Sequence, residues 1–178
     1  MYGKIQDTVF RALDALEIRN GAGHSELRID KAGNIRIIEI GSRMGGDCIG
    51  SDLVPLSTGQ DFVAMAVDTA AGKPPVFTEK KKKVSAIRFL MDSNDLKHLQ
   101  ELQKEHPDKV KKVVLEGDVE QAQITDSGSR PGFFILQTDT MEEMEELFYH
   151  GPWGKSAEGA SGDSNTKAEI YRKRQGQC

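Results

Sequence analysis

The sequence has few cysteines, few aromatic residues and no long hydrophobic run. Only Cys48 and Cys178 are cysteine, at no spacing typical of a metal site. We therefore expect reduced thiols rather than a disulfide framework or a cysteine-ligated metal. No apolar stretch approaches the ~20 residues of a transmembrane helix, and the N-terminus lacks the basic and apolar regions of a signal peptide. The expected protein is cytoplasmic and has no membrane partner.

Excess positive charge is also absent. Lys and Arg total 24 and Asp and Glu total 28, which gives a formal net charge of −4 at pH 7 and argues against nucleic acid as a partner. The lysine run 80–83 is the local exception, and without interleaved aromatic residues it favours a solvated boundary between two parts of the chain. What is present is 37% apolar and 29% charged residues, the balance of a globular protein of one domain or two small ones.

A predicted β-hairpin that carries two acidic residues is the most informative stretch. Residues 24–30 and 35–40 are rich in β-branched side chains, and the turn between them contains glycine and asparagine, which accept the left-handed backbone of a tight turn. A turn centred on residues 32 and 33 would place Glu26 opposite Glu39 on one face. Like charges so placed destabilise a hairpin, so we expect a cation or a shared proton between them. Oxygen ligands of this kind suit Mg²⁺.

A second interpretation of the hairpin stays open, in which Arg28 and Arg36 screen the carboxylates on an exposed face without any metal. The residues that follow favour a site. Arg43 comes four residues after Glu39, and a glycine-rich, acidic loop, 44–52, comes next. Glycine allows a ligand to approach the backbone, and an arginine beside acidic metal ligands suits phosphate or acyl-phosphate chemistry.

His24 lies on the same strand face as Glu26. It would orient a substrate carboxylate or phosphate, or hydrogen-bond within the hairpin, and a Zn²⁺ site of this histidine with the two glutamates is a third interpretation. Cys48, in the loop, is interpreted as an incidental small residue rather than a reactive thiol.

In order along the chain, these motifs resemble the C-terminal portion of an ATP-grasp domain, the fold of carboxylate–amine ligases, biotin carboxylase and carbamoyl-phosphate synthetase. The family has an acidic metal ligand on one strand, Glu-x-Asn-x-Arg or a variant at the end of the next, and a Thr-Gly that opens a helix. The corresponding residues here are 24–26, 39–43 and 57–61. The Gly-Gly-Asp after the arginine is most similar to the amino-acid and dipeptide ligase branch.

The resemblance implies roles for seven residues. Mg²⁺ would lie between Glu26 and Glu39 and the phosphates of ATP, and Arg43 would stabilise an acyl-phosphate. The remaining residues would lie near cofactor (Gly45 and Gly46) or near substrate (His24 and Asp47). Gly41 departs from the pattern, because the family often has a metal-ligating asparagine there.

The fold expected from the sequence is α+β. Residues 1–78 would form the C-terminal part of an ATP-grasp domain, an antiparallel sheet with helices, and residues 79–178 a small α+β domain with a basic tail anchored by Trp153 and Tyr171. Periodicity and capping residues predict helices over 4–17, 59–71, 93–106 and 140–148. Further strands are predicted over 84–91, 110–115, 119–125 and 133–138.

The leading functional hypothesis is a fragment of an ATP-dependent ligase that activates a small-molecule carboxylate as its acyl-phosphate, which an amine then attacks. The glycine-rich phosphate loop and paired lysines of the family's ATP site are not found before residue 20, so we expect the isolated chain to be inactive. The alternative is a non-catalytic interaction module with a degenerate site, which forms a homodimer through an exposed apolar face.

Overall fold

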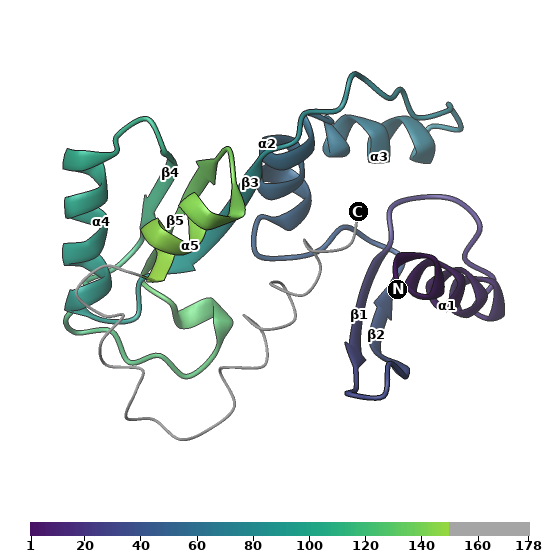
Figure 1. Cartoon of the computed structure of the whole chain (residues 1–178), viewed down its shortest axis with the longest axis horizontal. Helices are drawn as coiled ribbons and strands as arrows, with labels where there is room; N and C mark the ends of the chain where they lie inside the picture. The colour runs from purple at the N-terminus through teal and green to yellow at the C-terminus, as the bar shows by residue number, and fades with distance from the viewer. Residues whose placement is uncertain (150–178) are drawn as a thin grey trace.

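Two antiparallel sheets organise the protein, whose computed structural model describes residues 1–149 (Figure 1). The first half contains α1 (Tyr2–Ala15), β1 (His24–Ile29), β2 (Ile35–Gly41), the π-helix η1 (Ile49–Leu53), α2 (Val54–Thr58) and α3 (Phe62–Ala70). The second contains β3 (Val84–Phe89), α4 (Ser93–Glu105), β4 (Val110–Leu115), the 3₁₀ turn η2 (Ser127–Ser129), β5 (Gly132–Thr138) and α5 (Met141–Tyr149). The predicted α+β class is confirmed.

The hairpin of β1 and β2 pairs Glu26 with Glu39, as predicted, but through an irregular register. Next to the turn, Ile29 pairs with Ile35, a register that would bring Ile38 opposite Glu26. A shift of one residue between Glu26 and Leu27 leaves Ile38 without a partner and brings Glu39 into its place. This is a β-bulge, which re-aims the side chains beyond it.

The turn of the hairpin is closed by Asp30. Its carboxylate accepts hydrogen bonds from the backbone N–H groups of Ala32 (3.0 Å) and Asn34 (2.8 Å) and from the Asn34 side chain (2.8 Å). These bonds, with those from Asn34 foremost, lower the pKa of Asp30. Gly33 has a φ of 83°, so the predicted left-handed position is present.

The second sheet has the strand order β3-β5-β4, and its central strand supplies most of the core. One cluster of buried apolar side chains joins β5 to α4 and α5, and it includes Phe134, Leu136, Leu99, Leu102, Met144 and Leu147. Helix α4 begins as predicted, because the Asp92 carboxylate accepts hydrogen bonds from the backbone of Asn94 (2.8 Å) and Asp95 (3.1 Å).

The strand predicted over 119–125 is wrong. Residues 116–131 instead form a loop closed by its own polar side chains. Asp126 caps η2 by accepting hydrogen bonds from the backbone of Gly128 (2.8 Å) and Ser129 (2.9 Å). Val119 is buried in the core, which explains the apolar signal there without a strand.

The segment 49–58 is helical and joins the two sheets (Figure 1), although residues 49–52 were expected to lie in the glycine-rich loop. From the second sheet, the Ser85 hydroxyl donates to the carbonyl of Leu53 (2.8 Å) and the Gln137 amide to that of Leu56 (2.5 Å). The helix predicted from residue 59 begins at Phe62, because Gly59, with a φ of 75°, ends α2 and Asp61 caps α3.

Two features complete the description. Among residues 1–149, no helix is long and apolar enough to cross a membrane. Trp153 and Tyr171, predicted to anchor the tail, lie outside the described residues, as does Cys178.

His98 of α4 is a buried titratable side chain, 3% exposed, beneath α5. Its Nε2 lies 2.9 Å from the carbonyl oxygen of Leu147, so we assign the proton to Nε2. Nδ1 then has no partner among the residues described here. Burial, followed by the nearby positive charge of Arg88, lowers the pKa of His98 below 6.5.

We predict that the protein loses stability between about pH 7 and about pH 5, before its carboxylates titrate. Because the pKa of His98 is lower in the folded than in the unfolded state, the unfolded chain binds the additional proton and the free energy of unfolding falls as pH falls. His98→Gln keeps a donor for the Leu147 carbonyl without this titration. The midpoint of thermal unfolding, measured across this range, is expected to depend less on pH in the variant than in the unmodified protein. An equal dependence on pH in the two proteins would contradict the assignment.

Candidate functional site

At the open end of the hairpin, each of the two paired glutamates has a basic partner. Glu39 Oε1 accepts a hydrogen bond from Nη2 of Arg43 (3.0 Å), and Glu26 Oε1 lies 3.3 Å from Nε2 of His24. Both glutamate side chains are about half exposed, at 56% for Glu26 and 52% for Glu39, so these contacts add little stability. The carboxylates are therefore available to a ligand at small cost.

Arg43 lies along the end of β2. Its Nη1 donates to the carbonyl oxygen of Met44 (3.0 Å). A Cβ added at Gly41 would lie 3.4 Å from Cγ of Arg43, so the stem of this arginine packs over the glycine.

The two adjacent glycines of the loop have different environments. A Cβ at Gly45 would lie 2.8 Å from Nδ1 of His24 and 3.1 Å from Cβ of Ile49, whereas a Cβ at Gly46 would meet nothing within 4 Å. Gly45 is therefore required for the loop to lie against the His24 ring. Gly46 leaves its backbone open.

Asp47 is bound by a residue of the second half of the chain. Its Oδ1 accepts a hydrogen bond from Nη2 of Arg130 at 2.8 Å. Arg130 is 83 residues further along the chain, between the predicted strands 119–125 and 133–138. Sequence reasoning missed it because no local pattern relates the two positions.

Asp52, at the end of the same loop, is bound by Lys112 of β4 at 3.0 Å and by the Ser51 hydroxyl at 2.6 Å. Burial would raise the pKa of Asp52, but these two partners outweigh it and lower the pKa. Half-buried Cys48 has its pKa raised by burial and then by the negative charge of Asp52, so its thiol is not activated.

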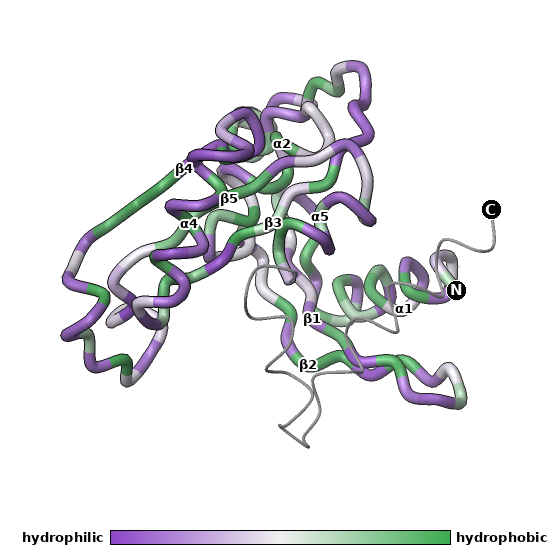
Figure 2. Tube along the Cα trace, turned by 60° about the vertical axis from the view of Figure 1, so that its left-hand side comes forward, coloured by the Kyte–Doolittle hydropathy of each residue, from purple (hydrophilic) through white to green (hydrophobic). Residues whose placement is uncertain are grey.

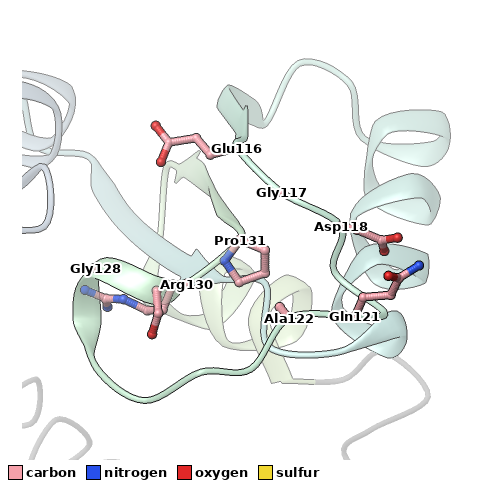
Figure 3. Close-up of a pocket in the computed structure, with 9 residues that line it drawn as sticks. Glu116, Gly117, Asp118, Gln121, Ala122, Gly128, Arg130 and Pro131 are labelled. Carbon is pink, nitrogen blue, oxygen red and sulfur yellow. The ribbon is translucent and has the colours of Figure 1, made fainter.

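A cavity of about 430 Å³ opens beside Arg43, between the end of the hairpin and α3. Small side chains predominate in its lining, which consists of Asn20, Gly21, Ala22, Ser42, Arg43, Met44, Ala66, Thr69 and Ala70. A second cavity, of about 420 Å³, lies in the loop 116–131 with Arg130 at its rim (Figure 3). The first cavity is lined by Arg43, the candidate catalytic residue.

Residues 1–149 contain no cluster of three or more His, Cys, Asp or Glu side chains suited to a metal ion. This argues against a Zn²⁺ site of His24 with the two glutamates. The pair Glu26 and Glu39 does fit the chemistry of Mg²⁺, which takes one or two protein carboxylates and fills its remaining positions with water and phosphate oxygens.

No protein-family model matches the sequence, and a search of curated proteins finds no match. Solved structures do match. An L-amino acid ligase from Bacillus licheniformis superposes with a TM-score of 0.64 and 24% identity over 82% of this chain, and phosphoribosylglycinamide synthetase from Anaerococcus prevotii with 0.61 and 18% over 78%. N5-carboxyaminoimidazole synthetase from Staphylococcus aureus, in complex with ADP, gives 0.57 and 15% over 84%.

These matched proteins have the ATP-grasp fold of carboxylate–amine ligases, so the chain has part of an ATP-grasp fold. The resemblance expected from the motifs is confirmed at this level. The chain spans 38%, 37% and 38% of the lengths of the three solved chains. The likeness establishes the fold, and the activity has to be argued from the site.

We predict that Gly45→Ala and Gly46→Ala, adjacent and chemically identical substitutions, have different effects. The added methyl at 45 must displace His24 and Ile49, which is expected to cost about 1–3 kcal/mol of unfolding free energy. At 46 the expected change is within about 0.5 kcal/mol. Urea unfolding of both variants measures the difference, and equal effects would contradict the packing of the loop against His24.

Proposed function

We propose that this chain is part of an ATP-dependent carboxylate–amine ligase and that Glu26 and Glu39 hold its Mg²⁺. The observation that carries the proposal is the pairing of these two glutamates across the bulged hairpin, with Arg43 at the same end. The matched L-amino acid ligase and the ADP complex of N5-carboxyaminoimidazole synthetase support it. Cys48 forms no disulfide among residues 1–149, which suits a cytoplasmic compartment.

In this proposal a carboxylate oxygen of the substrate attacks the γ-phosphorus of ATP, ADP leaves, and an acyl-phosphate forms. An amine then attacks the acyl carbon, and phosphate leaves as the amine loses a proton. Arg43 exchanges its exposed contact with Glu39 for the phosphoryl oxygens, to which its planar fork is matched. Bound Mg²⁺ would offset the charge of the phosphates. Gly45 and Gly46 bring backbone close to the nucleotide, and positioning does most of the work.

The substrates proposed are a small carboxylate and a small amine. The cavity beside Arg43 adjoins the residue proposed to stabilise the acyl-phosphate, which suits a carboxylate with a compact apolar substituent. His24, held under Gly45, is proposed to orient the carboxylate, and Asp47, on the other side of the loop, to meet the amine.

We predict that the chain binds Mg²⁺ with ADP and that Glu26→Gln/Glu39→Gln weakens this binding by about tenfold or more, as loss of metal-site groups commonly does. The matched control is Glu105→Gln/Glu142→Gln, which removes the same charge from exposed positions on α4 and α5. Calorimetric titration of each protein makes the comparison. Absence of binding by the unmodified chain, or equal affinities in the two double variants, would contradict the proposal.

An interaction module that forms a homodimer is the second candidate, and α1 favours it. None of the α1 side chains is buried, and its exposed apolar residues include Tyr2 and Phe10. Ile38 of β2 is also exposed. Hydrophobic and hydrophilic residues alternate along this helix (Figure 2). An apolar face of this kind is a candidate interface between two copies of the chain.

If this face mediates dimerisation, the sedimentation coefficient of the chain rises with concentration, and Phe10→Ser shifts the midpoint to higher concentration. Lys4→Ser, on the same helix, is the control that leaves the apolar face intact. A monomer at all concentrations would remove the second candidate, whereas dimerisation without any response to Mg²⁺ and ADP would place it ahead of the ligase.

A further inference from the structure

We propose that Arg130 is a positioning residue for the glycine-rich loop 44–48. From the second sheet it holds the carboxylate of Asp47, and through the loop it fixes the backbone to which Arg43 is hydrogen-bonded. This inference rests on the proposed function, because it assigns the loop a ligand. It makes the three-stranded sheet a part of the site rather than an appended domain.

The Arg130 side chain is held at three points. Its Nη2 donates to Asp47 at 2.8 Å, its Nε donates to the carbonyl of Ser127 at 2.7 Å, and its Cζ lies 3.6 Å from the centre of the Phe89 ring. It is only 15% exposed, whereas Asp47 is 52% exposed. A guanidinium stacked on a ring and bonded on two sides has little rotational freedom left, so it is a rigid partner for a loop carboxylate.

The backbone that carries Arg130 is also constrained. Asp126 and Ser129 form a capping box around η2, in which the Ser129 hydroxyl accepts from the backbone N–H of Asp126 (3.0 Å). Pro131 follows directly and favours the extended conformation observed at Arg130, φ −67° and ψ 128°. The loop 116–131 therefore fixes the backbone position of Arg130 (Figure 3).

A second cation repeats the arrangement at Asp52 in η1, the helix that follows the loop. Phe89 and Phe133 are paired across β3 and β5 and meet edge to face, with ring centres 6.2 Å apart. Lys112 lies over Phe133 at 5.9 Å and holds Asp52. Each of the two aromatic rings thus carries a cation that holds a carboxylate of the first half of the chain.

The backbone at the end of loop 44–48 needs such support. Asp47 and Cys48 have φ values of 48° and 60°, in a region that side-chain-bearing residues rarely adopt, and such conformations persist only where their surroundings impose them. On one side Gly45 is closed against His24, and on the other Asp47 is tied to Arg130. Just before Gly45, the Met44 carbonyl accepts a hydrogen bond from Arg43. Loss of the contact between Asp47 and Arg130 would therefore make the whole loop 44–48 more mobile.

The thiol of Cys48 reports on the loop directly, since it is half-buried and adjacent to Asp47. In a Cys178→Ser background it is the single cysteine, so its rate of alkylation by iodoacetamide measures how often the loop opens. The variants are Arg130→Met, which keeps an apolar stem over Phe89, Arg130→Lys, and Asp47→Asn. The control is Arg19→Met, which breaks an exposed arginine–aspartate pair with Asp14.

We expect Arg130→Met to accelerate alkylation of Cys48 by roughly fivefold, as loss of an ion pair and a cation–π contact implies, with an unchanged circular dichroism spectrum. The alkylation rate of Arg130→Lys should be intermediate, because lysine keeps the positive charge but lacks the planar guanidinium. Cys48 in the double variant Asp47→Asn/Arg130→Met should be alkylated no faster than in the faster of the two single variants, since both substitutions remove the same contact. A rate for Arg130→Met equal to that of Arg19→Met, or additive effects of the two substitutions, would overturn the inference. Should Arg130→Met not fold, Asp47→Asn alone carries the same comparison.

Ligand binding separates positioning from simple structural support. Where the unmodified chain binds Mg²⁺ with ADP, Arg130→Met is expected to weaken that binding severalfold, and Arg130→Lys to recover part of it. Faster alkylation with unchanged affinity would overturn the positioning role. If the unmodified chain shows no binding, the proposed function fails, and the alkylation rates alone then decide whether Arg130 holds the loop.

Discussion

The one-residue register shift in the hairpin is the constraint on which the candidate site depends. Without it, the pairing that begins at Ile29 and Ile35 would bring Ile38 opposite Glu26 and turn the glutamate of β2 to the other face. With it, Glu26 and Glu39 are paired across the two strands, and Arg43 follows just after the end of β2. A bulge at the edge of a functional site is a common way for a sheet to aim side chains.

The loop after Arg43 is shaped by contacts from both sheets. His24 of the hairpin packs against Gly45, and cations of the three-stranded sheet hold Asp47 and Asp52. The segment 49–58 continues from this loop and is hydrogen-bonded to the second sheet through Ser85 and Gln137. Two sheets with separate strand pairings are thus joined around one glycine-rich loop, so packing in the second sheet affects the chemistry available in the first.

Much of the fold could be predicted because its signals are local. The capping aspartate before α4, the turn glycine of the hairpin and the β-branched and aromatic residues of β3, β4 and β5 each act over a few residues. The failures have a different cause. Val119 resembles a strand residue because it is buried, yet it lies in a loop that its own polar side chains close. The helical segment 49–58 mixes glycine, serine and proline with apolar residues, and it is held by bonds to distant positions.

The sequence by itself determined the acidic hairpin, the arginine after it and the resemblance to ATP-grasp proteins, because these depend on residues adjacent in the chain. Only the tertiary structure decided how the site is held. The bulge, the contact between Gly45 and His24, and the ion pair between Asp47 and Arg130 depend on which surfaces meet when the two sheets pack. Arg130 lies 83 residues from Asp47, and a contact over that distance leaves no periodic or local pattern in the chain.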